Sequence, residues 1–212
     1  MFSFKGFQTQ DKNTHLEHLE DDIINRGSKG GDNAINFLKS VRNMLAGNSG
    51  SKTNITVKWD GAPAIICGIN PENGKFFVGT KSVFNKTPKI NYTTSDIRRN
   101  HGGEVAKKLA VCLAQLSRLN IKGILQGDLL FTDDLKAINI DGEKMVSFTP
   151  NTITYAVPMS SDLGRRIIRA KMGIVFHTQY TGKTMNNLSA SFGTVRASSG
   201  RNVFLASASY QD

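Results

Sequence analysis

The stretch VKWDGAPAI, residues Val57 to Ile65, places a lysine, an aspartate and a glycine between two apolar runs. Two arrangements fit this pattern. In the first, Asp60 and Gly61 form the bend of a β-hairpin, for which Asp-Gly is a preferred pair, and Lys58 points into solvent. In the second, Lys58 is held in a pocket as a nucleophile. The sequence on either side has to distinguish the two.

The flanking sequence predicts an α+β fold with largely antiparallel strands. Apolar residues at helical spacing, with capping residues before them, indicate α-helices at residues 13–26, 32–46, about 104–119 and 162–172. Short apolar runs bounded by turn residues indicate β-strands. These strands are expected at residues 55–59, 64–69, 75–80, 123–131, 138–140, 145–148, 152–157, 173–178 and 202–206.

We expect the chain to have two parts. Residues 1–50 form an N-terminal helical segment, in which a glycine-rich break at residues 27–31 separates two helices. This segment is expected to pack on the main domain. Residues 51–212 form that domain, and whether it continues beyond Asp212 stays open.

The composition indicates a globular protein with a polyanionic partner. The chain has 212 residues, 39% of them hydrophobic, and a formal net charge of +10. No apolar run approaches the roughly 20 residues of a membrane helix, and the N-terminus does not resemble a signal peptide, so we expect a cytoplasmic protein without a membrane partner. The excess of lysine and arginine favours nucleic acid, DNA or RNA, because basic side chains neutralise phosphates. Cys67 and Cys112 stand in apolar contexts and are expected to be reduced core residues.

Three stretches follow one another in a recognisable order. Lys58-Trp59-Asp60-Gly61 matches the pattern K-x-D-G, Gly127-Asp128-Leu129 is similar to G-E-L on a strand, and Met172 to His177 is similar to E-G-h-V-h-K, where h is apolar. Together they resemble the first, third and fourth motifs of the covalent nucleotidyltransferase superfamily, which comprises ATP-dependent DNA ligases, RNA ligases and mRNA capping enzymes. The chain also resembles uncharacterised tailed-phage proteins that share KWDGAPA, which makes the host cytoplasm the expected location.

The resemblance implies a ligase-type nucleotidyltransferase domain, similar to ATP-grasp folds, in which antiparallel sheets are flanked by helices. It implies that Lys58 attacks the α-phosphate of ATP, with Mg²⁺ or Mn²⁺, to form a lysyl-AMP that activates a nucleic acid 5′-phosphate. GTP as donor and protein as acceptor stay open. Because a free lysine has a pKa near 10.4, Lys58 would need partial burial or a nearby cation to become nucleophilic.

The resemblance also assigns the site residues. Lys58 and Asp60 are catalytic, and Asp60 orients the amine or its metal-bound water. The residues expected to bind the nucleotide are Gly61, Lys81, Asp128, Tyr155 and His177. No metal ligands are assigned. His15 and His18 share a helix face, but acidic neighbours without a third ligand favour a solvated face there.

Within this assignment the nucleotide-binding residues have different tasks. Gly61 lets the backbone approach the nucleotide, and Asp128 accepts hydrogen bonds from the ribose hydroxyls. Tyr155 stacks on the base. Lys81 and His177 meet the phosphates.

A structural interpretation stands beside each of these roles. Lys58 is then a surface lysine at a hairpin bend, Asp128 a turn residue, Tyr155 a core aromatic and His177 a hydrogen-bonded strand histidine. The alternative hypothesis for the whole chain is a non-catalytic nucleic-acid-binding or virion-associated phage protein on the same fold. It is favoured by Met172, which replaces the glutamate of the fourth motif, and by the lack of a K-x-K fifth motif on a late strand. The oligomeric state stays open.

Overall fold

The computed structural model describes residues 19–46, 57–192, 197 and 200–208. The chain divides into two compact units, Met1–Ile55 and Thr56–Asp212. The expected packing of the N-terminal segment on the main domain stays a prediction.

The described part of the first unit is a pair of helices, α1 (Leu19–Arg26) and α2 (Ser28–Leu45). The expected break at residues 27–31 is wrong, because only Gly27, with φ 58°, separates the helices. Gly30 lies inside α2, where a Cβ would overlap the carbonyl oxygen of Asp22. Gly30 therefore permits close packing of the two helices, whereas Gly27 ends the first one. The expected start of the first helix, at residue 13, lies outside the described residues.

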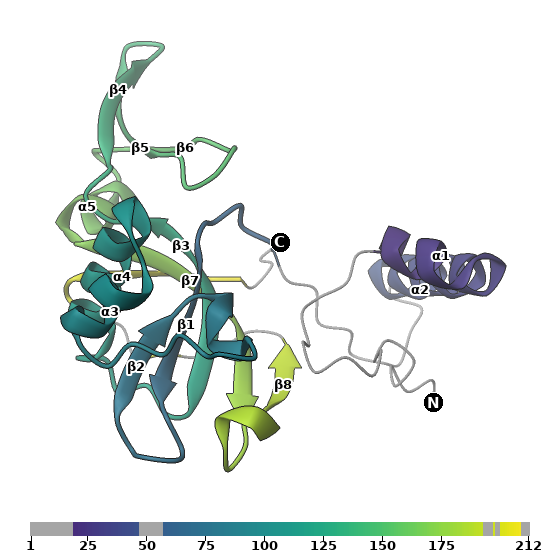
Figure 1. The fold of residues 1–212 in the computed structure, drawn as a ribbon. Helices are drawn as coiled ribbons and strands as arrows, with labels where there is room; N and C mark the ends of the chain where they lie inside the picture. The colour runs from purple at the N-terminus through teal and green to yellow at the C-terminus, as the bar shows by residue number, and fades with distance from the viewer. Residues whose placement is uncertain (1–18, 47–56, 193–196, 198–199, 209–212) are drawn as a thin grey trace. The chain divides into compact units, whose positions relative to one another are not determined.

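Six strands of the second unit form one sheet (Figure 1). Its order is β2 (Phe76–Gly79), β1 (Ala64–Ile69), β3 (Ile124–Phe131), β7 (Met172–Thr181) and β8 (Ser189–Phe192), with β9 (Val203–Ala206) also paired to β7. A second sheet contains β4 (Lys136–Ile140), β5 (Glu143–Phe148) and β6 (Tyr155–Pro158). Every pairing is antiparallel except that of β7 with β9. The predicted α+β fold with largely antiparallel strands is confirmed, although β8 was not expected.

Three helices accompany these sheets, namely α3 (Thr94–Asn100), α4 (Gly103–Leu116) and α5 (Asp162–Arg169). The short α3 was not expected, because Ile97 is its one buried residue and it therefore has no apolar stripe. A capping box of Thr93 and Asp96 starts it. The helix expected at 162–172 ends three residues early, since Met172 already belongs to β7. None of the described helices is long and apolar enough to cross a membrane.

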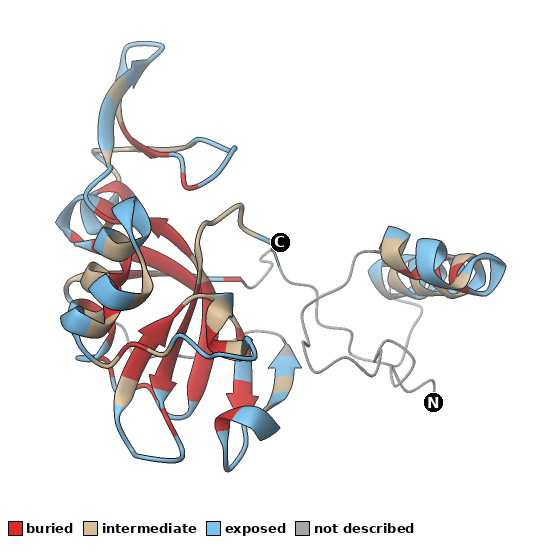
Figure 2. Cartoon of the chain, viewed as in Figure 1, coloured by how far each residue is buried: buried red, intermediate tan, exposed pale blue. Residues whose placement is uncertain are grey.

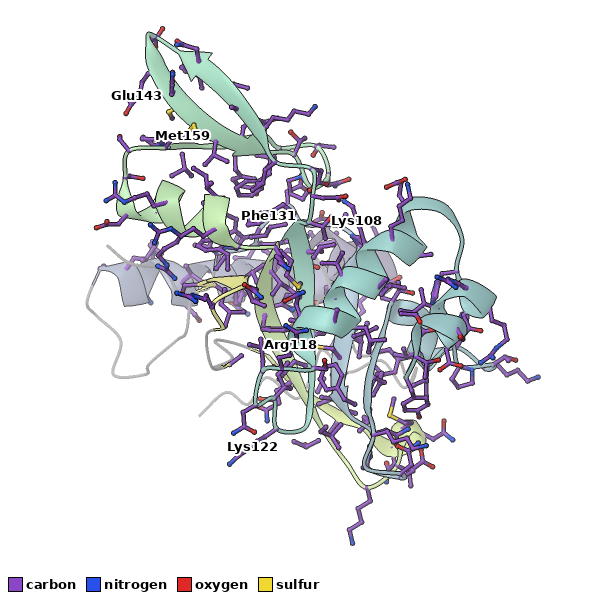
Figure 3. The ribbon with its side chains drawn as sticks, turned by 90° about the vertical axis from the view of Figure 1, so that its left-hand side faces the viewer. Lys108, Arg118, Lys122, Phe131, Glu143 and Met159 are labelled. Carbon is purple, nitrogen blue, oxygen red and sulfur yellow. The ribbon has the colours of Figure 1, made fainter. Side chains whose placement is uncertain are left out.

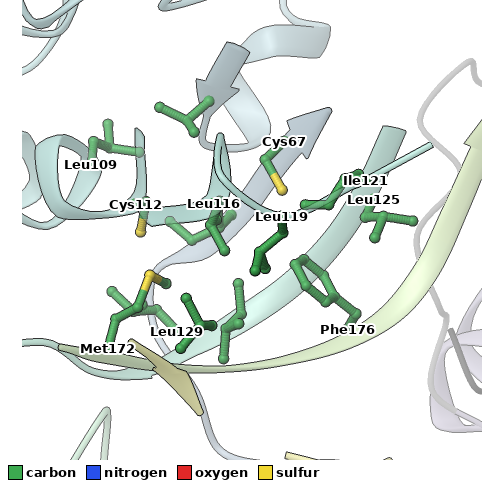
Figure 4. Close-up of a cluster of buried hydrophobic side chains, with 14 of the residues drawn as sticks. Cys67, Leu109, Cys112, Leu116, Leu119, Ile121, Leu125, Leu129, Met172 and Phe176 are labelled. Carbon is green, nitrogen blue, oxygen red and sulfur yellow. The ribbon is translucent and has the colours of Figure 1, made fainter. Parts of the chain in front are cut away.

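The core follows the alternation of side chains along the strands. Leu125 and Leu129 of β3 pack with Cys112 and Leu116 of α4 in the cluster shown in Figure 4. The neighbouring Leu130 points to the other face of the sheet and belongs to a different cluster. Asp128 is two residues from Leu130, so its side chain points to the same face of β3, which α4 does not cover.

The buried positions are concentrated on the strands of the main sheet (Figure 2). On the face opposite α4, Phe131 packs with Phe148 of β5 and Ile167 of α5, and Figure 3 shows Phe131 beside α5. The second sheet and α5 are thus anchored to the main sheet by one aromatic cluster. Both cysteines are buried and free, as expected, and burial raises the pKa of Cys112 to about 12.

Candidate active site

The segment that carries Lys58 is not a strand. Residues 57–60 have no regular secondary structure, so the strand expected at 55–59 is wrong for its described residues. The Val57 amide donates to the Ala208 carbonyl (2.8 Å), and the Trp59 indole donates to the Ser207 carbonyl (3.0 Å). These contacts to the chain just after β9 replace a strand ladder. Lys58 between them is exposed.

The segment then runs onto the centre of the main sheet. The Ala62 amide donates to the Leu129 carbonyl (3.0 Å), and the Leu129 amide donates to the Pro63 carbonyl (3.2 Å). A Cβ placed on Gly61 would lie 2.5 Å from the Cβ of Asp128. Only a glycine permits this approach of the backbone to β3. The chain turn at Gly61 therefore places the Lys58 segment next to Asp128.

The carboxylate of Asp60 holds a loop from the second sheet. It accepts hydrogen bonds from the Asn151 amide group (2.9 Å), the Thr152 backbone (2.8 Å) and hydroxyl (2.7 Å), and the Ile153 backbone (2.8 Å). These donors, led by Asn151 and Thr152, hold the pKa of Asp60 well below its usual range. The carboxylate is thus ionised, with three of these bonds on Oδ2 and one on Oδ1. Its evident role is to fix the loop against the Lys58 segment.

We expect Asp60→Asn to release this loop. The asparagine oxygen can replace only one carboxylate oxygen and carries no charge, and its NH₂ group would face the Asn151 donor. The bonds to the loop therefore weaken, and amide exchange at Thr152 and Ile153 should accelerate about tenfold or more. Hydrogen exchange measures this directly. Asp141→Asn is the matched control, because Asp141 is exposed at a turn with φ 50°, which asparagine tolerates. Equal protection in wild type and Asp60→Asn would contradict the anchoring role.

The lowered pKa of Asp60 also predicts a pH dependence. A carboxyl group whose pKa is depressed on folding stabilises the fold above its unfolded pKa, near 3.9, and this stabilisation is lost only as pH falls through the lower folded value. Protection of the Thr152 and Ile153 amides should therefore be equal at about pH 7 and pH 5. Hydrogen exchange at both values, corrected for the intrinsic rate, tests this, and a loss of protection at pH 5 would contradict it.

A β-bulge brings His177 to Asp128. The register between β3 and β7 shifts from Gln126↔Thr178 to Gly127↔Phe176, which leaves His177 as the extra residue. Its Nε2 lies 3.5 Å from Oδ2 of Asp128, and its Nδ1 lies 2.8 Å from the Thr178 hydroxyl. The two residues that the sequence predicted separately are therefore one pair.

This pair is only partly buried on the two central strands. From 124 to 131 along β3 every residue is buried except Asp128, and from 172 to 178 along β7 every residue is buried except His177. Their side chains keep 18% and 22% of their accessible surface, respectively. Two polar groups thus remain accessible on otherwise buried stretches of β3 and β7.

Tyr155 joins the Lys58 segment to β6. Its hydroxyl accepts from the Asp60 amide (2.9 Å), and its ring centroid lies 5.1 Å from that of Trp59 and 5.3 Å from that of Phe148. The expected strand at 152–157 begins only at Tyr155, because residues 152 and 153 bond to Asp60 instead. The contacts of Tyr155 give it a structural role in the site, and stacking on a base stays a prediction.

We expect Tyr155→Phe to weaken this junction. The change removes the acceptor of the Asp60 amide and keeps the ring between Trp59 and Phe148. Loss of one such hydrogen bond costs about 0.5–1.5 kcal/mol of the free energy of unfolding. Urea denaturation measures the difference. If both the stability and the exchange of the Asp60 amide were unchanged, the Tyr155 hydroxyl would have no part in holding the site together.

Lys81 was expected at the end of a strand, but it lies two residues beyond one. β2 ends at Gly79, and Thr80 caps a short 3₁₀ helix, Lys81–Phe84, by accepting from the Ser82 amide. Gly79 is paired with Ile66 of β1, and two residues further along this direction Ala64 pairs with Asp128. Exposed Lys81 therefore stands at the same end of the sheet as the Asp128–His177 pair.

The described residues do not offer a site for a metal ion held by the protein. They contain no group of three histidine, cysteine, aspartate or glutamate side chains that could hold one. Met172, at the position of the fourth-motif glutamate, is fully buried among apolar residues. We therefore derive no chemical step through Mg²⁺ or Mn²⁺ held by the protein.

Sequence reasoning missed the residues that hold the site together. The loop residues Asn151 and Thr152 bind Asp60, and the bulge at His177 sets its partner. The polar run TPNT at 149–152 signals a turn but not what it binds. A bulge has no local pattern that distinguishes it from a regular strand residue.

Comparison with known proteins supplies a family. The family model described as "Family of unknown function (DUF6267)" matches residues 13–212. No curated protein and no solved structure matches the chain.

Proposed function

The chain belongs to this family of unknown function, DUF6267, and we propose that it is a ligase-type nucleotidyltransferase that forms a covalent lysyl-AMP at Lys58. The observation that carries the proposal is the docking of the KWDG segment. Gly61 packs on Asp128, and the Asp60 amide bonds to Tyr155, 95 residues away in sequence. Residues that resemble separate motifs of one superfamily are thus in contact.

The proposed reaction uses the Lys58 amine as the nucleophile. The lone pair of its uncharged Nζ attacks the α-phosphorus of ATP and forms an N–P bond. The bond from this phosphorus to the oxygen that bridges to the β-phosphorus breaks, and pyrophosphate leaves. The amine proton passes to solvent, since Lys58 is exposed. A 5′-phosphate oxygen of a nucleic acid then attacks the same phosphorus and releases the lysine.

The proposed nucleotide contacts follow from the partly exposed Asp128–His177 pair. Asp128 has free lone pairs for ribose hydroxyls, and His177 beside it can donate to a phosphate when protonated. Lys81 adds a positive charge at this end of the sheet. Gly61 leaves room for the nucleotide at the turn.

The exposure of Lys58 changes one expectation. Partial burial and a nearby cation were the two expected ways to make the amine nucleophilic, and Lys58 is exposed. The proposal therefore relies on a nearby cation, for which Lys81 at the same end of the sheet is the candidate.

Two observations favour a second candidate, a non-catalytic nucleic-acid-binding protein on the same fold. Met172 is a core residue at the position of a family metal ligand. The late strand β9 reads VFLA and carries no lysine. Both features fit a fold that has kept its architecture and lost its chemistry.

One experiment separates the candidates. Purified protein is incubated with α-labelled ATP and Mg²⁺ or Mn²⁺, denatured and separated by electrophoresis. Label that survives denaturation supports the nucleotidyltransferase, and repeating the assay with GTP, CTP and UTP gives the donor. Salt-sensitive binding of DNA or RNA without covalent label would support the second candidate.

A further inference from the structure

The described part of the second unit carries six exposed basic side chains that form a series from α5, past the start of β7 and β9, to the chain between α4 and β3. We call them the basic strip, and they are Arg118, Lys122, Arg166, Arg169, Lys171 and Arg201. Within the described residues, none of the six makes an ion pair with a carboxylate. By contrast, Arg99, Lys107 and Lys108 each pair with one.

Backbone and core contacts connect the parts of this series. The Lys171 amide donates to the Asn202 carbonyl (2.8 Å), so Lys171 lies next to Arg201. The Asn202 side chain donates to Gln115 of α4 (3.3 Å), and a Cβ on Gly200 would lie 2.6 Å from Leu119. The segment 200–202 therefore bridges the end of α5 to the end of α4. Figure 3 labels Arg118, just after the end of α4, and Lys122 on the loop that leads to β3.

The part of the basic strip on α5 is held by contacts to the second unit's core. Arg166 lies with its guanidinium carbon 5.6 Å from the ring centroid of Phe204 on β9. Ile167 of the same helix is buried in the aromatic cluster and anchors α5 to the core. The arginines at 166 and 169 are exposed on this anchored helix.

We propose that the basic strip binds the phosphate backbone of a nucleic acid. The cations form a series, and four of the six are arginines, whose planar forks suit phosphate oxygens. Because these cations lack carboxylate partners, they can bind phosphates and release counterions from a polyanion without breaking an ion pair within the protein. The strip also accounts for part of the net charge of +10.

β9 connects the strip to the Lys58 segment. It starts two residues after Arg201 and is followed by Ser207 and Ala208, which bond to Trp59 and Val57. Six residues of extended chain span about 20 Å, or about three nucleotides of an extended single strand. A nucleic acid whose 5′-phosphate lies at Lys58 can therefore reach the strip. This choice of polyanion rests on the proposed function, whereas the basic surface does not.

The test is a triple substitution with a matched control. Arg169→Gln, Lys171→Gln and Arg201→Gln remove three charges of the strip and leave the Arg166–Phe204 contact intact. The control, Lys75→Gln, Lys86→Gln and Arg98→Gln, removes three exposed charges from the β1–β2 turn and the segment up to α3. Binding of a fluorescent 30-nucleotide single strand and of a 30-base-pair duplex is measured by anisotropy across a salt series.

We expect the strip variant to lose about tenfold or more in affinity at about 0.1 M salt, and its log–log salt slope to fall by about 2 to 3. The control should stay within about twofold of wild type. Equal losses in both variants, or no binding by the wild type at low salt, would overturn the proposal. Selective loss of binding to phosphatidylserine vesicles with nucleic-acid binding unchanged would also overturn it, in favour of a membrane surface.

The outcome is separable from that of the proposed function. None of the three substituted residues contacts the Lys58 segment, so covalent labelling with ATP alone should be the same in wild type and strip variant. If nucleic-acid binding depends on the basic strip but no covalent label forms, the proposed activity is overturned and the basic strip is supported. If label forms but nucleic-acid binding is the same in the strip variant and the wild type, the basic strip is overturned and the proposed activity is supported. Circular dichroism and thermal melting confirm that both variants fold.

Discussion

Lys58→Arg is expected to abolish covalent nucleotide labelling. Arginine keeps the positive charge and most of the volume of lysine, but its guanidinium does not lose its proton at any pH at which the protein is folded. It therefore cannot supply the lone pair that forms the N–P bond. Because Lys58 is exposed and its described neighbours hold the segment through Val57 and Trp59, the free energy of unfolding should hardly change.

The measurement is label from α-labelled ATP that survives denaturation at neutral or alkaline pH, because the N–P bond of a phosphoramidate is labile in acid. Lys75→Arg is the control, because Lys75 is also exposed and lies in the β1–β2 turn, at the other end of β1 from the pairing of Ala64 with Asp128. We expect the label on Lys58→Arg to fall below about one hundredth of the wild-type level, and that on Lys75→Arg to be unchanged. Full labelling of Lys58→Arg would exclude Lys58 as the nucleophile, wherever the label resides. Mass spectrometry of the labelled wild-type peptide then identifies the attachment site.

The parts of the fold that the sequence predicted best are those with a strong local pattern. The run AIICGI gave β1 to the residue, since four buried apolar positions lie between turns. β3 was expected one residue too long, and α4 was expected to run three residues further than it does. The errors arose where tertiary contacts override local preference. The segment 57–59 has the composition of a strand, but its hydrogen bonds go to residues 207 and 208.

The candidate site shows the same division. The K-x-D-G pattern selected Lys58, Asp60 and Gly61 as a unit, and the contact of Gly61 with Asp128 is consistent with that choice. The role of Asp60 could not be derived, because its partners lie about 90 residues away in sequence. The sequence left open whether Lys58 gains partial burial or a nearby cation. The irregular segment leaves its side chain in solvent, so partial burial is not observed.

Gly61→Ala tests whether the docking of this segment matters for function. The added Cβ would lie 2.5 Å from Cβ of Asp128 and 3.0 Å from the Leu129 carbonyl oxygen. Neither atom can yield easily, because both belong to the central strand β3, so the segment itself has to move away. We expect a loss of about 1–3 kcal/mol in the free energy of unfolding. Displacement of a catalytic group by about 1 Å can cost about a hundredfold in rate, and labelling should fall by at least that factor.

Gly31→Ala is the matched control. Gly31 lies in α2 of the first unit, where an added Cβ meets nothing within 4 Å. Since alanine favours a helix over glycine, this change should stabilise the protein by about 0.4–1 kcal/mol or leave it unaltered, with labelling intact. Urea denaturation and the rate of labelling are measured for both variants. If Gly61→Ala labelled at the wild-type rate with unchanged stability, the packing of Gly61 on Asp128 would have no part in positioning Lys58. The proposed function would then lose the observation that carries it.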